Sequence, residues 1–537
     1  MQYLNGLKKL EVLLKKDIIL LSIFFVFVIL FYSSLFSYNS THDDNLRYIN
    51  IGRTLAEEGK YIGNFWNSPP LVPFMIFLLY SSGVNLFAIT FIIPLFFIIL
   101  FLIANFYLFR TLYNRTIGYL VMFMIITLPS FLRWASKIST DLPSATFAVL
   151  SMFFFYLGIE KERKHLVLSS LFFVLSLLSK ISGIMLVIVY TFYILYRRKL
   201  NILKTKEFLL SISIATIIPS VVMAVLYVSD PSIFSFKSIY HAVLYQGQGL
   251  MIKFFLNPLF LFVPLGIWKV IKDIKNGKNI EKEHMLIILA IVSFLFLFTR
   301  MITLMRYLTV IYGMISFLSI YGLFALRKGK LAFLFVLILS AGLIVGFINT
   351  VYLMDIDNNT RYGVYDVAEY ISKFLGNEII AAGMIGKYLT TYTSKNIVLF
   401  PTYVDIDNKT ITYEEYFDII TNPSNPNYNK YVSLTREGKI KTYVYFDEKW
   451  LRDNNVSYVI WSLYDDFSLN PREEYYNIKY AGIELPIKRP YNTIRPPPDF
   501  VFSSEIYKYL ESSNNFEVIK KFYKNGQKII IIYKYYF

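Results

Sequence analysis

The feature that most constrains the fold is a series of long apolar runs separated by short charged segments. The first run, from about Asp17 to Phe36, has roughly the twenty residues that a helix needs to cross a bilayer. With 55% apolar residues among 537, the chain has too much apolar surface for a soluble globule. About ten further runs of spanning length follow, at 85–109, 116–134, 142–158, 166–180, 183–197, 207–228, 252–270, 285–300, 307–325 and 331–353. The sequence predicts a polytopic α-helical membrane protein with about eleven transmembrane helices.

Lysine and arginine gather in alternate loops between these runs. The richer loops contain Lys8, Lys9, Lys15, Lys16, Arg110, Arg115 and the segments 161–165, 197–206, 269–282 and 327–330. Cytoplasmic loops are the richer ones in membrane proteins. We therefore expect an integral cell-membrane protein with a cytoplasmic N-terminus, the first run serving as a signal anchor. An odd number of spans then places the C-terminus outside.

Charge and cysteine content exclude several classes of function. The net charge of +17 comes from clusters between apolar runs and not from one basic soluble face, so we expect no nucleic-acid partner. The chain has no cysteine, which excludes disulfides and thiolate zinc sites.

The composition changes beyond Met354, where charged residues, Asn, Pro and Tyr become more frequent and no run is long enough to span. We divide the chain into a membrane domain, 1–354, and a soluble extracytoplasmic domain, 355–537. The spacing of apolar residues predicts a helix at 364–375. Strands are predicted at 378–383, 396–400, 456–463 and 528–536, which favours a small α/β or α+β unit.

The first outer loop contains two adjacent carboxylates, Asp43 and Asp44. An acidic start and a closing glycine at Gly59 predict a short helix there, and we expect outer-loop helices within about 43–80. Such a pair is often only solvated or caps its helix.

Other ionisable groups are predicted on the same outer face. They are Arg133, Lys137 and Asp141 in the second outer loop, Lys180 in a tight turn, and Arg300 and Arg306 in a later loop. Taken singly, each cation could be a snorkelling anchor. Taken together, they predict a pocket of carboxylates facing cations. In such a pocket a carboxylate can accept the proton of a hydroxyl group, and the cations can neutralise a lipid phosphate.

Five segments resemble, in chain order, the membrane region of GT-C glycosyltransferases of the protein O-mannosyltransferase and lipid A aminoarabinose transferase group. The segments are "DDNLRYINIGRTLAEEGKY" (43–61), "SPPLVPFMI" (68–76), "STDLPSATFAVLSMFFF" (139–155), "LSLLSKISGIMLVI" (175–188) and "MRYLTVIYGMISFL" (305–318). There are departures. Asn45 replaces a second acidic residue, and Asn67 and Ser68 replace a Glu-Lys pair, which removes one expected phosphate-binding lysine.

The resemblance implies transfer of one sugar from a polyprenyl- or dolichyl-phosphate donor on the outer membrane face, with inversion at the anomeric carbon. It aligns the family's leading aspartate with Asp44, which we predict to be the general base beside Asp43. Asp141 is predicted to orient the acceptor or the sugar. The residues predicted to bind the substrate or the lipid phosphate are Arg47, Tyr48, Arg133, Lys137, Lys180, Arg300, Arg306 and Tyr307.

A divalent cation, Mg or Mn, is a possible cofactor, because the carboxylates of Asp43, Asp44 and Asp141 could hold it against the phosphate. The related mannosyltransferases do not demand a metal. His42 is interpreted as a surface residue and not as a ligand, and with only four histidines in the chain we expect no His-based metal site.

Two other classes remain open. A transporter or flippase of lipid-linked sugars or polysaccharides would also have many spans, but such proteins usually place their ionisable site near the midplane and show paired repeats. A receptor or assembly subunit could use the aromatic-rich segment 403–500. For the enzyme, the partners are the bilayer, the lipid-linked donor and an acceptor that is a protein, a lipid or a polysaccharide.

Overall fold

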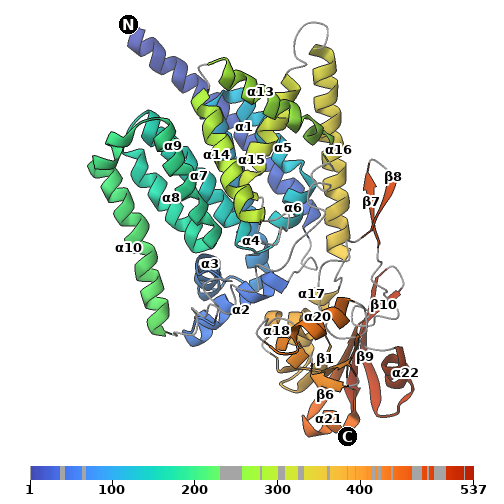
Figure 1. The fold of residues 1–537 in the computed structure, drawn as a ribbon. Coiled ribbons are helices and arrows are strands. Elements are labelled where there is room, and N and C mark those ends of the chain that lie inside the picture. The colour runs from blue at the N-terminus through green and yellow to red at the C-terminus, as the bar shows by residue number, and fades with distance from the viewer. Residues whose placement is uncertain are drawn as a thin grey trace.

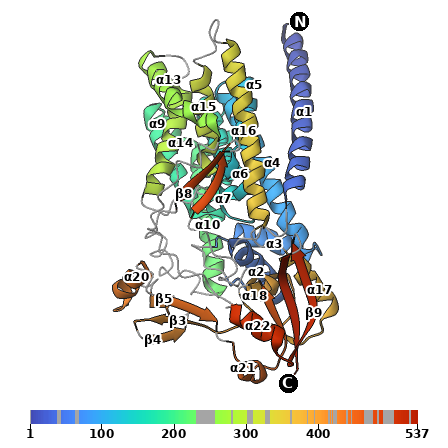
Figure 2. The ribbon, with the colours of Figure 1, turned by 90° about the vertical axis from the view of Figure 1, so that its right-hand side faces the viewer.

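The computed structural model shows a bundle of helices with a smaller strand-containing part at one end (Figure 1, Figure 2). The end of the bundle that faces this part is called the sheet end. The structure describes residues 2–36, 43–62, 68–229, 257–277, 281–299, 309–324, 332–359, 363–383, 385–393, 395–407, 409–412, 415–416, 418–419, 425–436, 440–444, 446–462, 475–480, 483–488, 504–524 and 527–536.

Each predicted apolar run overlaps at least one helix of the bundle. These helices are α1 (Gln2–Leu35), α4 (Leu86–Leu112), α5 (Arg115–Ile126), α6 (Pro129–Ala135), α7 (Asp141–Glu160), α8 (His165–Ser179), α9 (Met185–Tyr196), α10 (Lys206–Ser229), α13 (Val263–Lys275), α14 (Glu281–Thr299), α15 (Tyr312–Leu323) and α16 (Ala332–Asn359).

Length and hydropathy single out part of this set as membrane spans. Within the described residues, 4 helices are long and apolar enough, namely α4, α7, most of α10 and the middle of α16, or up to 5 if the bent pair α5 and α6 is one span. Apolar segments of α1, α8, α9 and α15 are shorter. The structure thus has the predicted helical class, while the number of eleven spans stays a prediction. On α10, apolar side chains such as Val228, 84% exposed, suit a lipid environment.

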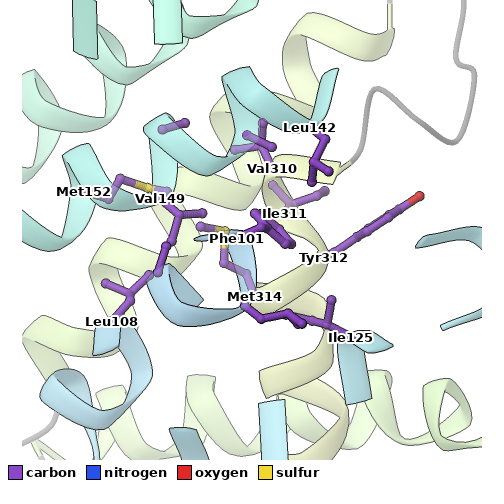
Figure 3. Packing of buried hydrophobic residues seen from close by; sticks show 14 of the residues in the cluster. Phe101, Leu108, Ile125, Leu142, Val149, Met152, Val310, Ile311, Tyr312 and Met314 are labelled. Carbon is purple, nitrogen blue, oxygen red and sulfur yellow. The ribbon is translucent and has the colours of Figure 1, made fainter. Parts of the chain in front are cut away.

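Large apolar side chains from distant segments form the core of the bundle. Figure 3 shows Phe101 of α4, Val149 of α7 and Met314 of α15 in one cluster, and all three are buried. This packing fixes α7, whose first residue lies at the sheet end, against the middle of the bundle.

Helices α7 and α8 form an antiparallel hairpin whose register is set by serine side chains. Ser176 Oγ donates to Ser144 O at 2.9 Å, and Ser144 Oγ donates back to Ser176 O at 3.2 Å. Ser151 and Ser169, each seven residues further from the sheet end on its helix, repeat the arrangement at 2.7 and 2.9 Å. All four serines are buried. Hydrogen bonds of this kind hold helices together where no water is present.

The run predicted at 116–134 is not one straight helix, because α5 and α6 meet at an angle of 69°. Leu128 is extended between them and Pro129 begins α6, where the missing N–H of proline costs no helical hydrogen bond. Thr127 O, near the break, accepts from Asn257 Nδ2 at 3.4 Å. The break turns α6 across the sheet end of α5.

Helices α2 (Asp43–Glu58) and α3 (Leu71–Ser81) lie at the sheet end (Figure 1), within the predicted range 43–80. Gly59, the predicted closing glycine, follows the end of α2 with a φ of 69°, in the left-handed conformation that glycine adopts readily. The two helices pack closely at Gly52, where a Cβ atom would lie 2.6 Å from Ile76 Cγ2.

The part beyond α16 contains helices and three separate sheets. Its helices are α17 (Val364–Phe374), α18 (Ile385–Tyr392), α20 (Tyr428–Arg436), α21 (Glu448–Asp453) and α22 (Ser504–Ser512). Its strands are β1 (Ile379–Ala382), β2 (Ile397–Leu399), β3 (Thr402–Ile406), β4 (Lys409–Thr412), β5 (Ile440–Val444), β6 (Val456–Ser462), β7 (Tyr475–Tyr480), β8 (Ile483–Lys488), β9 (Phe516–Lys524) and β10 (Gln527–Tyr535).

The largest sheet has the strand order β2-β1-β6-β10-β9. Strand β1 is parallel to β2 and β6, whereas β10 is antiparallel to β6 and β9. The four predicted strands are confirmed as β1, β2, β6 and β10, and the predicted helix is α17. Strand β10 lies between β6 and β9, and its residues Ile530, Ile531 and Ile532 are all buried.

Candidate active site

Asp141 and Lys180 form an ion pair at the sheet end of the bundle. Asp141 is the first residue of α7, and Lys180 directly follows the last residue of α8. Because the two helices are antiparallel, the start of one lies beside the end of the other. The structure thus brings together two residues that were predicted from separate loops.

The position of each charge favours the pair. A carboxylate is stabilised at the N-terminus of a helix and an ammonium at a C-terminus, because the exposed N–H and C=O groups there carry partial charges. The Asp141 side chain is 7% exposed and that of Lys180 is 22% exposed. Removing either partner would leave the other charge poorly solvated, so this pair is a strong electrostatic feature of the site.

Helix α2 contacts the same place through Tyr48. The Tyr48 hydroxyl lies 3.3 Å from Thr140 Oγ1, and Thr140 immediately precedes Asp141. The guanidinium of Arg47 lies 5.2 Å from the centre of the Tyr48 ring, and Arg47 Nη2 donates to the Tyr48 hydroxyl at 3.4 Å. Arg47 is exposed whereas Tyr48 is buried. Four predicted residues, Arg47, Tyr48, Asp141 and Lys180, therefore belong to one constellation.

Asp43 and Asp44 are the first two residues of α2. Their side chains lie outside what the structure describes. Asp44 precedes Tyr48 by four residues, which places both positions on the same face of α2. The predicted base thus stands on the helix, and on the helix face, that contacts the start of α7.

The cations of the second loop are gathered around one indole ring. Arg133 Cζ lies 5.6 Å and Lys137 Nζ lies 4.8 Å from the ring of Trp134 in α6. Lys137 is only 8% exposed, although it carries a charge. Cation–π contacts of this kind help to hold such groups in place.

Arg300, Arg306 and Tyr307, the predicted late phosphate-binding residues, lie outside the described residues. Among the side chains that the structure describes, no group of three or more His, Asp or Glu could hold a metal ion. Asp43 and Asp44 are not among those side chains, so the divalent cation stays a prediction.

Sequence reasoning missed two features of the site. Thr140 had no role before its contact with Tyr48 was seen. Asn45 was noted only as a departure from an acidic position, yet it is 5% exposed and its Oδ1 accepts no hydrogen bond within the described part of the chain. A polar residue next to an acidic pair on a short helix was the available signal for Asn45.

Comparisons with known proteins agree with this architecture. Residues 67–227 match the family of dolichyl-phosphate-mannose-protein mannosyltransferases. This segment contains α3 to α9 and most of α10, and with them Asp141 and Lys180. No significant relative was found among curated protein sequences.

Two solved structures of ArnT from Cupriavidus metallidurans share the fold. The apo structure has a TM-score of 0.56 at 15% identity, covering 85% of this chain and 96% of ArnT. The structure bound to undecaprenyl phosphate has a TM-score of 0.53 at 14% identity, covering 89% and 99%. The fold shared with ArnT and the match of residues 67–227 to the mannosyltransferase family agree with the resemblance to GT-C glycosyltransferases in the sequence motifs.

Proposed function

We propose that the chain is a membrane glycosyltransferase that transfers a sugar from a polyprenyl-phosphate-linked donor to an acceptor at the outer membrane face. The observation that carries the proposal is the Asp141–Lys180 ion pair, with its buried carboxylate, and the contact of α2 with the neighbouring Thr140 through Tyr48. The sheet end of the bundle is then the outer face, and the N-terminus is cytoplasmic.

The similar proteins support the donor class. ArnT was solved with undecaprenyl phosphate bound, and the matching family is described by dolichyl-phosphate-mannose. Both lipids present a phosphate at the membrane surface. The sugar and the acceptor of this chain, whether protein, lipid or polysaccharide, are not specified by these comparisons.

In the proposed reaction, an acceptor hydroxyl oxygen attacks the anomeric carbon of the donor from the side opposite the phosphate. The new bond joins the acceptor oxygen to that carbon, and the bond from the carbon to the phosphate oxygen breaks. The leaving electron pair stays on the polyprenyl monophosphate, and the hydroxyl proton goes to Asp44 as general base. Attack from the opposite side inverts the configuration of the sugar.

Lys180 is proposed to bind the donor phosphate. The donor is a phosphodiester with one negative charge, and cleavage leaves a polyprenyl monophosphate with a second one, so an ammonium beside it is bound more strongly as the leaving group forms. As this charge develops, Lys180 moves toward the phosphate, and one oxygen of Asp141 becomes able to accept from a sugar or acceptor hydroxyl. Arg47, Arg133, Lys137 and Arg306 are further candidates for neutralising the leaving group.

The test is to follow both products of a doubly labelled donor, with one label on the sugar and one on the lipid. The purified protein in nanodiscs is given polyprenyl-phosphate sugars and mixed acceptors. If the protein transfers the sugar, we expect equal amounts of glycosylated acceptor and of free polyprenyl phosphate, with the configuration of the anomeric carbon inverted. In proteoliposomes, movement of the intact donor across the bilayer without either product would favour a flippase and contradict the proposal.

A further inference from the structure

Helix α2 is held from two sides. Toward the bundle, Tyr48 and Ile49 belong to the main apolar core, and Gly52 packs against α3. Toward the strand-containing part, Leu46 is 6% exposed and belongs to that part's own apolar core. Arg53 follows Leu46 by seven residues, so both stand on one face of α2.

Arg53 binds the end of helix α18. Its Nη1 donates to Thr390 O and to Thr391 O, both at 3.0 Å. The last carbonyl groups of a helix have no partner within the helix and carry a partial negative charge. A guanidinium with two such acceptors is therefore well matched to the C-terminal turn of α18. Glu57, 3.7 Å from Arg53 Nε, helps to hold the guanidinium in place.

A second contact joins the same parts beside α2. The ring of Phe87, in the first turn of α4, stacks on Tyr392 at 4.8 Å between ring centres and meets Tyr365 edge-on at 4.3 Å. Tyr392 is the last residue of α18, and Tyr365 lies in α17. Figure 1 shows α18 next to α2 at the sheet end. The end of α18 is thus anchored on both α2 and α4.

We propose that the strand-containing part of the chain positions helix α2. Arg53 is the positioning residue, because its contact with α18 fixes where the acidic start of α2 lies. The inference rests on the proposed function, since it assigns to this part a task in catalysis. Arg53 stands more than two turns from Asp44, so it acts through the helix and not on the substrate. Tyr48, between them, transmits the position of α2 to Thr140 and Asp141.

The first test compares steady-state transfer by the full chain with Arg53→Ala, Arg53→Lys and a control, Arg452→Ala. Arg452 pairs with Glu448 inside the same part of the chain and makes no described contact with α2. Because a misplaced catalytic group can cost up to about 100-fold in rate, we expect Arg53→Ala to lower kcat with little change in donor KM. We expect Arg53→Lys to restore part of the loss and Arg452→Ala to resemble wild type.

The second test measures the docking of the strand-containing part on α2 without an activity assay. The chain has no cysteine, so Leu46→Cys introduces a single thiol that docking keeps buried. Losing a hydrogen bond to a charged group should make this thiol at least about tenfold faster to react with a maleimide when Arg53→Ala is added. The same addition of Arg452→Ala should leave the rate unchanged.

The two readouts separate the possible failures. An unchanged labelling rate, or an unchanged kcat despite faster labelling, would overturn the role of Arg53. If the wild type transfers no sugar from any donor while labelling responds to Arg53→Ala, the proposed function fails and the docking contact stands.

Discussion

The two serine clamps between α7 and α8 allow a test of how the Asp141–Lys180 pair is positioned. The clamp of Ser144 and Ser176 lies within about one helical turn of that pair. The clamp of Ser151 and Ser169 has the same two hydroxyl-to-carbonyl bonds one heptad further from the site, and Ser151 Oγ also hydrogen-bonds to the Tyr190 hydroxyl. Replacing both serines of one clamp by alanine therefore gives a site-near variant and a matched distant control.

The expected magnitude follows from the bonds that are lost. Each clamp contains two hydroxyl-to-carbonyl bonds. Interhelical bonds in membranes contribute about 0.6 kcal/mol on average and up to about 1.7. Each double variant should then lose about 1–3 kcal/mol of stability. If donor binding must reorder the loosened hairpin, about 0.6–1.4 kcal/mol of this lost stability is subtracted from the free energy of donor binding. The donor KM of the near-clamp variant then rises roughly three- to tenfold.

The assay combines thermal unfolding in detergent with donor KM measurements on membranes that contain equal amounts of protein. The distant variant should lose at least as much Tm as the near one, because it also loses the hydrogen bond to Tyr190. Only Ser144→Ala with Ser176→Ala should raise the donor KM. Equal KM increases in the two variants would show that the serines act only through general stability. No KM increase in either would refute the link between hairpin register and the ion pair.

Three further predictions test separate parts of the structure. Lys180→Met should weaken donor binding by about tenfold or more, since the charged contact proposed between Lys180 and the phosphate is lost, and equal binding in a donor titration would exclude Lys180 as the phosphate ligand. Burial first, and then the charge of Glu369, raise the pKa of Asp366. The ionised form is thus disfavoured on folding, and stability is lost as the pH rises through the raised pKa. Asp366→Asn should therefore raise the Tm at pH 7 and not at pH 3, and no gain at pH 7 would contradict this. Gly52→Ala should cost about 1–3 kcal/mol by forcing α2 away from Ile76, and an unchanged Tm would show that the contact relaxes.

The apolar runs and the strands β1, β2, β6 and β10 could be predicted because their residues form continuous apolar segments of the right length. Strand β9 was not predicted, since lysines interrupt its apolar residues, as suits an exposed edge strand. The bend between α5 and α6 was also missed. Pro129 was a local signal for the break, but the contact of Thr127 with Asn257 joins residues 130 apart in sequence.

For the site, topology was the informative signal. Asp141 and Lys180 were expected on the same face because they stand at the ends of adjacent antiparallel helices. The contact of Tyr48 with Thr140 joins residues 92 apart in sequence, and no local sequence pattern predicts it. The role of Arg53 was likewise hidden, because its partners are backbone carbonyl groups, whose position depends on folding and not on residue type.

The most direct test of the central claim is single-turnover transfer of radiolabelled sugar from a polyprenyl-phosphate donor by the wild type, Asp44→Asn and Asp43→Asn, with donor binding measured in parallel. Since a general base contributes about 10²–10⁴-fold to a rate, Asp44→Asn should lose transfer by that factor and keep donor binding, while Asp43→Asn loses much less. Transfer by Asp44→Asn at the wild-type rate would contradict its assignment as the base.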